Sequence, residues 1–274
     1  MAPPVVLSVA GSDSGGGAGI QADLKAFAAC GVHGATALTA LTAQNTLGVD
    51  GVHPVPGEFI LAQVRAVASD LGVDAVKVGM LGDSPTVHTV ARALEELRVG
   101  AEPIPVVVDP VMVAESGAVL LDAAARRALV ERILPLATVV TPNVAEARVL
   151  AGTGVRDDPE DLVRAIRDLG PGVVVLTGGH REEAEDVFWD GDRLELIAGE
   201  RHPGDAAHGS GCTHSSALAA HLARGYPPLE AARAAKAVAA EAVRRGLREL
   251  GAGSGPVDAL GVLERARSAA RPRL

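Results

Sequence analysis

The segment Gly209-Ser210-Gly211-Cys212 places a potential general base inside a turn of small residues. An alanine-rich stretch follows and predicts a helix, whose first N–H groups have no partner within the helix. These N–H groups and the helix dipole would stabilise negative charge on a transferring phosphoryl group. The same field would lower the pKa of the Cys212 thiol, so that its thiolate accepts the proton of an attacking hydroxyl group. The alternative is that Cys212 is a small hydrophobic residue at a buried helix start.

A second set of candidates consists of oxygen donors that follow apolar runs. Asp109 comes directly after residues 106–108, and Asn143 and Glu146 follow residues 138–140. Magnesium is commonly held by one or two carboxylates together with water and substrate phosphates. Asp109 and Glu146 are therefore candidate Mg²⁺ ligands. A structural role is the alternative and can coexist with this one: Asn143 would cap a helix, with Glu146 as its capping-box partner.

Gln44 and its neighbour Asn45 are expected just past the carboxyl end of an apolar strand, where open α/β sheets bind ligands. The amide of Gln44 offers a donor and an acceptor together, which complements the edge of an aminopyrimidine. The alternative is a polar loop residue that bonds its own backbone.

Glycines dominate residues 11–19, and such a strand-to-helix turn lets backbone N–H groups approach a ligand closely. The stretch is not a Walker P-loop, because Lys25 lies too far along the chain. It is not a dinucleotide-binding fingerprint either, because no Asp or Glu occurs between Asp23 and Asp50. The alternative is a tight turn without a ligand.

These candidates must be positioned by short apolar runs that alternate with longer helical segments. The runs predict strands at residues 5–10, 35–41, 75–78, 105–108, 138–140 and 173–176. Helices are predicted between them at residues 20–30, 56–71, 84–99, 122–134, 144–150 and 159–169. A hairpin is predicted at residues 186–189 and 193–197, followed by helices at 212–224, 229–245 and 257–270. This order predicts a parallel sheet with helices on both faces.

Composition excludes several classes of protein. The 274 residues carry 25 basic and 34 acidic side chains, a net charge of −9, whereas nucleic-acid and anionic-membrane proteins show a basic excess. No apolar stretch reaches the roughly 18 residues of a membrane span. Two cysteines make no disulfide framework, and there is no signal-peptide pattern, so we expect a cytoplasmic protein. Without linkers or repeats, residues 1–274 are expected to form a single domain.

Taken in order, these segments resemble the hydroxymethylpyrimidine/phosphomethylpyrimidine kinases of thiamine biosynthesis, within the ribokinase-like superfamily. The similarity covers nearly the whole chain. It is carried by Ala10-Gly11-Ser12-Asp13-Ser14-Gly15-Gly16-Gly17-Ala18-Gly19-Ile20-Gln21-Ala22-Asp23, Leu38-Thr39-Ala40 with Ala43-Gln44-Asn45-Thr46, Lys77-Val78-Gly79-Met80-Leu81, Val108-Asp109-Pro110-Val111-Met112, Thr141-Pro142-Asn143 with Glu146-Ala147, Gly178-Gly179-His180 and His208-Gly209-Ser210-Gly211-Cys212-Thr213. The resemblance implies an α/β fold: a three-layer αβα sandwich with a central, mostly parallel sheet and a small β-hairpin.

The resemblance also implies a reaction and a set of roles. The γ-phosphate of ATP would pass to the hydroxymethyl group of an aminopyrimidine, and then to the resulting monophosphate. The residues that match the family motifs are Gln44, Asp23, Gly11 and Met80 for the pyrimidine; Gly209, Ser210 and Gly211 for the anion hole, with Cys212 as the base; Asn143, Thr177 and Gly179 for the nucleotide; and Glu146, with Asp109, for Mg²⁺. A homodimer is ordinary in this family.

Three departures from the family pattern leave other functions open. Thr177 stands where the family usually has Lys before Gly-Gly-His, which removes a cation beside the ATP phosphates. His214-Ser215-Ser216 follows Cys212-Thr213 in place of the more usual Leu-Ser-Ala, and Ala252 stands where a His is often found. One alternative is a pyridoxal (vitamin B6) kinase, since both activities occur on similar chains. The other is a pyrimidine-binding protein that has lost catalysis.

Overall fold

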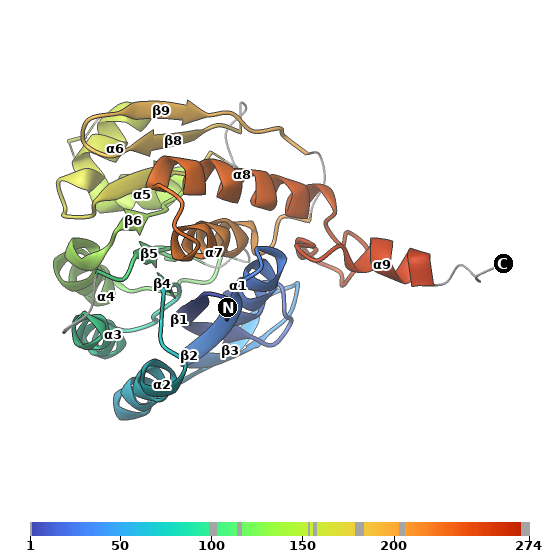
Figure 1. Cartoon of the computed structure of the whole chain (residues 1–274), viewed down its shortest axis with the longest axis horizontal. Helices are drawn as coiled ribbons and strands as arrows, with labels where there is room; N and C mark the ends of the chain where they lie inside the picture. Colours follow the sequence, from blue (N-terminus) through green and yellow to red (C-terminus); the bar gives the residue numbers. More distant parts are fainter. Residues whose placement is uncertain are drawn as a thin grey trace.

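A single sheet positions every candidate residue. The structure is a computed structural model that describes residues 2–98, 103–113, 117–152, 154–155, 158–178, 184–202 and 206–269. The strands are β1 (Val5–Asp13), β2 (His33–Gln44), β3 (Val49–Pro54), β4 (Ala75–Val78), β5 (Val106–Val108), β6 (Val139–Val140), β7 (Val173–Leu176), β8 (Asp186–Trp189) and β9 (Leu194–Ile197). Within these residues they follow the order β3-β2-β1-β4-β5-β6-β7-β8-β9, and only the β2–β3, β7–β8 and β8–β9 pairs are antiparallel (Figure 1). The predicted mostly parallel sheet and its hairpin are confirmed.

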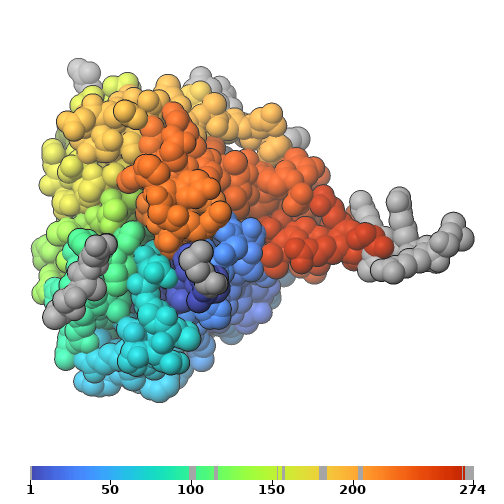
Figure 2. Space-filling view, viewed as in Figure 1, coloured from blue at the N-terminus to red at the C-terminus, as the bar shows by residue number. Residues whose placement is uncertain are grey.

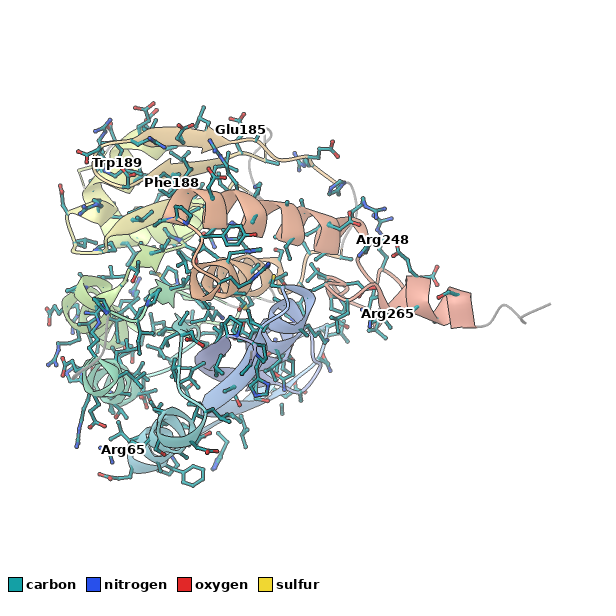
Figure 3. The ribbon with its side chains drawn as sticks, viewed as in Figure 1. Arg65, Glu185, Phe188, Trp189, Arg248 and Arg265 are labelled. Atoms are coloured by element: carbon teal, nitrogen blue, oxygen red, sulfur yellow. The ribbon has the colours of Figure 1, made fainter. Side chains whose placement is uncertain are left out.

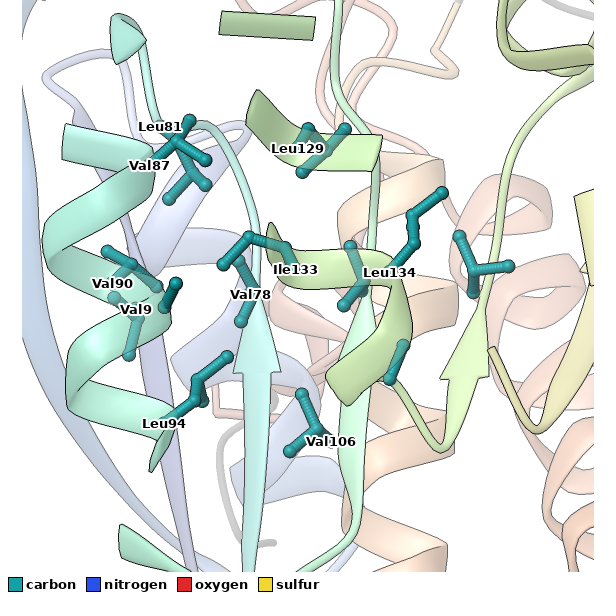
Figure 4. Close-up of a cluster of buried hydrophobic side chains, with 14 of the residues drawn as sticks. Val9, Val78, Leu81, Val87, Val90, Leu94, Val106, Leu129, Ile133 and Leu134 are labelled. Carbon is teal, nitrogen blue, oxygen red and sulfur yellow. The ribbon is translucent and has the colours of Figure 1, made fainter. Parts of the chain in front are cut away.

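Helices cover both faces of the sheet. On one face lie α1 (Gly19–Ala29), α7 (Ser210–Ala223) and α8 (Pro228–Arg244); on the other lie α2 (Gly57–Asp70), α3 (Ser84–Leu97), α4 (Ala123–Ala128), α5 (Val144–Ala151) and α6 (Pro159–Arg167). Strand residues alternate between two apolar clusters. Val107 packs toward α7 and α8, whereas Val106 and Val108 pack toward the opposite face, where Val106 lies near Leu94 (Figure 4). The predicted three-layer αβα sandwich is confirmed.

The aromatic residues of β8 serve packing. Phe188 and Trp189 lie side by side in the chain near the hairpin edge of the sheet (Figure 3). Phe188 is fully buried in the cluster under α7 and α8, and the guanidinium of Arg164 lies 4.4 Å from the centroid of the Trp189 ring. Neither ring therefore forms an open stacking platform for a base.

The structure differs from the predicted elements at three places. The prediction omits β3, an exposed edge strand whose Asp50, Gly51 and Pro54 are poor strand formers. The helix predicted at residues 122–134 divides into α4, a π turn η1 (Leu129–Ile133) and a 3₁₀ turn η2 (Leu134–Leu136), where Pro135 cannot donate a helical hydrogen bond.

The third difference concerns the last helix. The prediction of residues 257–270 is wrong at its start, since α9 begins later (Val262–Ala269), and residue 270 lies outside the described residues. The N–H of Val257 donates to the carbonyl oxygen of His208, and that of Asp258 donates to Ala242, so this segment is held in an extended form against α7 and α8. Figure 2 shows the region of α9 projecting from one side of the molecule.

The order of the strands locates the crevice in which a ligand is expected. The chain passes from β1 to β2 on one side and then returns to β4 on the other side of β1. Open α/β sheets bind ligands at such a switch point, outside the carboxyl ends of the strands. None of the described helices combines the length and the apolar composition that a membrane crossing requires.

Candidate active site

The turn before α7 presents free N–H groups, as predicted. Gly209 is the N-cap in a left-handed conformation (φ 81°), and the N–H of Ser210 turns back to the carbonyl oxygen of Ala207 at 3.0 Å. No described residue accepts a hydrogen bond from the N–H of Gly211 or of Cys212. Gly211 is exposed, and a Cβ atom added to it would meet no atom within 4 Å, so the turn is accessible at this residue. The turn can therefore bind an anion.

The prediction of a lowered thiol pKa is wrong for Cys212. Removal of water from around the thiol is the largest effect and, with the charges of Asp109 and Asp23, raises the pKa of Cys212 to about 12. Lys77 and a hydrogen bond from the N–H of Gly19 oppose this rise without cancelling it. The helix terminus does not decide the protonation state, because burial of the thiol outweighs the groups that favour the thiolate. Without ligands, Cys212 is a neutral thiol.

Those carboxylates belong to a buried charge cluster that Lys77 completes. Its Nζ lies 2.9 Å from Asp23 Oδ1 and 3.8 Å from Asp109 Oδ2, and its side chain is fully buried. Asp23 also accepts hydrogen bonds from Ser8 Oγ at 2.6 Å and Ser216 Oγ at 2.7 Å. Burial alone would lower the pKa of Lys77, but the carboxylates of Asp23 and Asp109 raise it. Lys77 thus pairs with two carboxylates, and this cluster lies beside Cys212 of the turn.

Asp23 lies below the open site rather than on its wall. Its exposure is 0%, and Lys77, Ser8 and Ser216 occupy its oxygens. A direct contact between Asp23 and a pyrimidine does not fit this arrangement. Lys77 had no predicted role, although a lysine within the apolar run of β4 was a usable signal, because a buried ammonium group must be paired.

Asp109 and Glu146 are brought together, and the helix-capping role of Asn143 and Glu146 is confirmed. The N–H of Asn143 donates to Glu146 Oε2 and the N–H of Glu146 donates to Asn143 Oδ1, both at 2.9 Å, which is a complete capping box at the start of α5. Burial and the nearby Asp109 raise the pKa of Glu146 to about 8. Burial also raises the pKa of Asp109, against the effect of Lys77.

Because burial and mutual repulsion raise these pKa values, a cation beside the Asp109–Glu146 pair would be needed to hold both carboxyl groups ionised. Carboxylate oxygens are donors that Mg²⁺ prefers, so the residues present fit this ion. The described residues contain no group of three or more His, Cys, Asp or Glu side chains that could hold a metal by themselves. Substrate phosphates and water would have to supply the remaining ligands.

The predicted pyrimidine contacts other than Asp23 lie around the switch point. Gln44 is the last residue of β2 rather than a loop residue, and its Oε1 accepts a hydrogen bond from Thr42 Oγ1 at 3.1 Å. No described residue accepts from its Nε2. At the end of β1, Gly11 packs so closely on the Met80 side chain that a Cβ atom would overlap Met80 Cε. Gln44, Gly11 and Met80 are thus at the carboxyl ends of β2, β1 and β4.

The glycine-rich turn after β1 binds a side chain of its own. Asp13 Oδ2 accepts hydrogen bonds from the N–H groups of Gly17 at 3.0 Å and Ala18 at 2.8 Å, and Oδ1 accepts from the N–H of Gly15 at 2.8 Å. The N–H of Gly16 donates to the carbonyl oxygen of Asp13. The expectation that these N–H groups face a ligand is therefore wrong. Asp13 was missed because an acidic residue beside glycines gives no signal of its partners.

On the nucleotide side, Thr177 follows β7 and forms a parallel bridge with Asn143. This bridge places both predicted nucleotide contacts at the same edge as Glu146. Gly179 lies outside the described residues, so its predicted role stays a prediction.

Asp186 fixes the backbone at Gly178, just after the end of β7. It accepts the N–H of Gly178 at 2.9 Å and pairs with Lys236 at 2.6 Å through the same Oδ1. Nε2 of His214 lies 3.1 Å from Oδ2, an ion pair when His214 is protonated. The charge of Lys236 is thus neutralised locally and does not replace the cation missing at Thr177.

The loop from Ser14 to Gly17 contacts both Gln44 and the anion-binding turn at Gly209. Ser14 Oγ donates to the carbonyl oxygen of Gln44 at 2.7 Å and accepts the N–H of Gln44 at 2.8 Å. Three residues later, Gly17 packs against Gly209, where a Cβ atom would overlap the carbonyl oxygen of Gly17. The aminopyrimidine candidate and the anion-binding turn therefore flank the same short loop.

Comparisons with known proteins identify the family of the chain. A hydroxymethylpyrimidine/phosphomethylpyrimidine kinase of Rhizobium meliloti is 49% identical over 259 residues, which cover 92% of this chain and 96% of the relative. The solved pyridoxal kinase of Bacillus subtilis, an ADP complex, superimposes with a TM-score of 0.85 at 37% identity over 96% of this chain and 99% of that one. A phosphomethylpyrimidine kinase from Clostridium difficile gives a TM-score of 0.76 at 37% identity, over 88% of this chain and 99% of that one.

The family model described as phosphomethylpyrimidine kinase matches residues 13–258. The match begins at Asp13, includes the cluster around Lys77 and the turn at Gly209, and ends at Asp258. The chain belongs to the phosphomethylpyrimidine kinase family.

Proposed function

We propose that the protein is an ATP-dependent kinase that phosphorylates 4-amino-5-hydroxymethyl-2-methylpyrimidine and then its monophosphate, yielding the diphosphate used in thiamine biosynthesis. One observation carries this proposal. The N–H groups of Gly211 and Cys212 have no described acceptor, Gly211 is exposed, and the loop from Ser14 to Gly17 connects this turn to Gln44. An anion site beside an amide that complements an aminopyrimidine fits an acceptor whose phosphorylated group lies next to its ring.

In this mechanism Gln44 orients the ring, and Gly11 with Met80 forms its floor at the switch point. The absence of a side chain at Gly11 leaves room for Met80. Asp23 acts indirectly: it holds Lys77 and Ser216 in place and does not touch the ring. Phosphoryl transfer depends mainly on alignment and charge neutralisation, so a rigid ring site is a direct contribution to rate.

The turn before α7, and a magnesium ion held by Asp109 and Glu146, would neutralise the charge of the phosphates. Gly211 and Cys212 would donate N–H groups to the transferring phosphoryl group, with Gly209 and Ser210 shaping the turn. Asp109 and Glu146 would hold Mg²⁺, and Asn143 and Thr177 would lie along the nucleotide phosphates. The bound ion would neutralise phosphate charge.

Cys212 is proposed to receive the hydroxyl proton in the first transfer. The hydroxymethyl oxygen bonds to the γ-phosphorus, the bond from that phosphorus to ADP breaks, and the proton moves to sulfur. Because the resting thiol is neutral, it must first release its own proton to water, and Lys77 is the neighbouring cation that favours the resulting thiolate. The second acceptor is a phosphate oxygen that is already largely ionised at neutral pH, so the second transfer needs no base.

The test is a coupled assay of ADP formation with the hydroxymethylpyrimidine, its monophosphate and pyridoxal. We expect both pyrimidines to be preferred. A preference for pyridoxal of about tenfold in kcat/KM, or about 1.4 kcal/mol, would reassign the substrate to the vitamin B6 class, as the similarity to solved pyridoxal kinases allows. Calorimetric binding of pyrimidine without turnover of MgATP would instead indicate a binding protein.

A homodimer is also proposed. Leu41 of β2, Leu47 of the turn between the strands and Val52 of the exposed edge strand β3 are 45%, 66% and 49% exposed. Exposed apolar residues at an unpaired sheet edge favour association. Light scattering during gel filtration should give twice the mass of the chain, and the mass of a single chain would contradict this proposal.

A further inference from the structure

The two glycine-rich turns pack directly on each other. A Cβ atom on Gly209 would overlap the carbonyl oxygen of Gly17, and one on Gly17 would overlap the ring of His208. The N–H of Gly19 also reaches the sulfur of Cys212. No side chain fits between the segments, so the position of one turn constrains the position of the other.

One side-chain pair joins the turns across this contact. Nε2 of His208 lies 3.1 Å from Asp13 Oδ2, the oxygen that already accepts the N–H groups of Gly17 and Ala18. Asp13 and His208 are 3% and 8% exposed. A carboxylate only accepts, so His208 must carry its proton on Nε2. Burial alone would raise the pKa of Asp13, but the hydrogen bonds from His208 and from the backbone lower it.

His208 is itself fixed from the opposite side. Its N–H donates to the carbonyl oxygen of Gly255, and its carbonyl oxygen accepts the N–H of Val257. Its backbone is therefore tied to the C-terminal segment, and its ring spans the gap to Asp13. Nothing in the sequence pattern placed these residues, 195 positions apart, in contact.

We propose that Asp13 and His208 are positioning residues, which fix the loop beside Gln44 to the anion-binding turn and so set the distance between the acceptor oxygen and the transferring phosphoryl group. This proposal rests on the proposed function. Neither side chain touches the reacting atoms. Their effect passes through Gly17, which Asp13 holds and which contacts Gly209, and through Ser14, which holds Gln44.

The kinetic test compares two substitutions of His208. Leu removes the donor but keeps an apolar side chain, whereas Gln carries an N–H donor the same number of bonds from Cα as Nε2. We expect His208→Leu to lower kcat by about 10- to 100-fold, since misplacement by about 1 Å has effects of that size, with KM for ATP changed less than about threefold. His208→Gln should recover most of the lost kcat.

A matched control lies near the end of α7, the helix that follows His208. His221 is also 8% exposed, and it contacts Tyr226 rather than the loop. His221→Leu should leave kcat unchanged even if it lowers the unfolding temperature as much as His208→Leu does. If His221→Leu and His208→Leu lose the same stability and the same kcat, the Asp13–His208 pair is merely structural and the proposal is wrong. The proposal is also wrong if His208→Gln does not restore kcat.

A second measurement does not depend on activity, so it separates this proposal from the proposed function. Hydrogen exchange of the ligand-free protein, followed by mass spectrometry, reports on the N–H groups that Asp13 holds. His208→Leu should speed exchange in the peptide containing residues 13–19, although the substitution lies in another segment. Faster exchange confined to residues 206–213 would overturn the proposal even in a fully active kinase, and coupled exchange in an inactive protein would support it while the proposed function fails.

Discussion

The turn at residues 11–19 and the turn at residues 209–212 have similar compositions but opposite uses of their N–H groups. In the first, the carboxylate of Asp13 accepts three N–H groups within five residues of its own position. In the second, no acidic residue occurs in the first turn of α7, and the N–H groups of Gly211 and Cys212 have no described acceptor. The first turn is closed by its own side chain, and the second is left open.

This difference teaches that glycine content alone does not indicate a ligand site. Glycine permits a close backbone approach, but whether N–H groups remain free depends on an acceptor within the fold. The first turn uses its glycines to wrap around Asp13 and to let Gly209 approach. The second can use them to bind an anion.

The largest expected effect distinguishes a chemical from a structural role for the open turn. Cys212→Ala should lower kcat for the hydroxymethyl acceptor by about 10²–10⁴, the usual contribution of a general base. The monophosphate acceptor, which has no hydroxyl proton to lose, should be affected far less. Steady-state rates with both acceptors provide the measurement. An equal loss with both would assign Cys212 to the shape of the turn, and no loss would remove it from the chemistry.

A matched pair of glycine substitutions tests the packing of the turns. Gly209→Ala combines a positive φ with overlap on Gly17, and should lower the free energy of unfolding by at least about 1–3 kcal/mol. Gly211→Ala has open space around it, and should leave stability unchanged or raise it by up to about 1 kcal/mol, while the methyl group obstructs the anion and lowers kcat. Urea unfolding and kinetics of both variants are required. Equal stability losses would break the distinction between a packed and an open position.

The acidic pair facing the open turn should make stability depend on pH. The pKa of Glu146 is about 8 in the folded protein, above the ordinary value of 4.5, so between these values the folded state binds a proton that the unfolded state has lost. The free energy of unfolding therefore falls as pH rises through this window, by up to about 1.4 kcal/mol per pH unit. Glu146→Gln removes this dependence and keeps a side-chain oxygen to accept the N–H of Asn143.

Urea titrations without metal, between about pH 6 and about pH 8, should show the variant gaining stability relative to the unsubstituted protein. Millimolar Mg²⁺ should stabilise the unsubstituted protein at the upper end of this range more than it stabilises Glu146→Gln. Parallel pH curves would show that the charge of Glu146 is already compensated, and no response to Mg²⁺ would remove this residue from the metal site.

The smallest expected effect concerns the nucleotide. Thr177→Lys should lower KM for ATP by a few-fold, about 1 kcal/mol or less, because a cation near the phosphates adds a partly screened interaction. Thr177→Met is the matched control, since it adds length without charge. An unchanged KM in Thr177→Lys would show that another group already serves the phosphates.

The sequence predicted the strands well where both faces of the strand are buried. The apolar runs of β1, β4 and β7 are buried on both faces and leave few alternatives to a parallel strand. Prediction failed for β3, whose polar residues pair with the end of β2, and for the start of α9, where Val257 is held by a hydrogen bond to the distant His208. Local propensity carries no information about such partners.

By itself, the sequence determined the family motifs, the layered fold and the residue types available for phosphoryl transfer. Only the tertiary structure decided which groups are free: it occupied Asp23 with Lys77, closed the first glycine turn on Asp13 and kept Cys212 neutral. The physical reason is that hydrogen bonding, desolvation and pKa values depend on neighbours distant in sequence. Residue type fixes what a group can do, and its buried neighbours fix whether it is available.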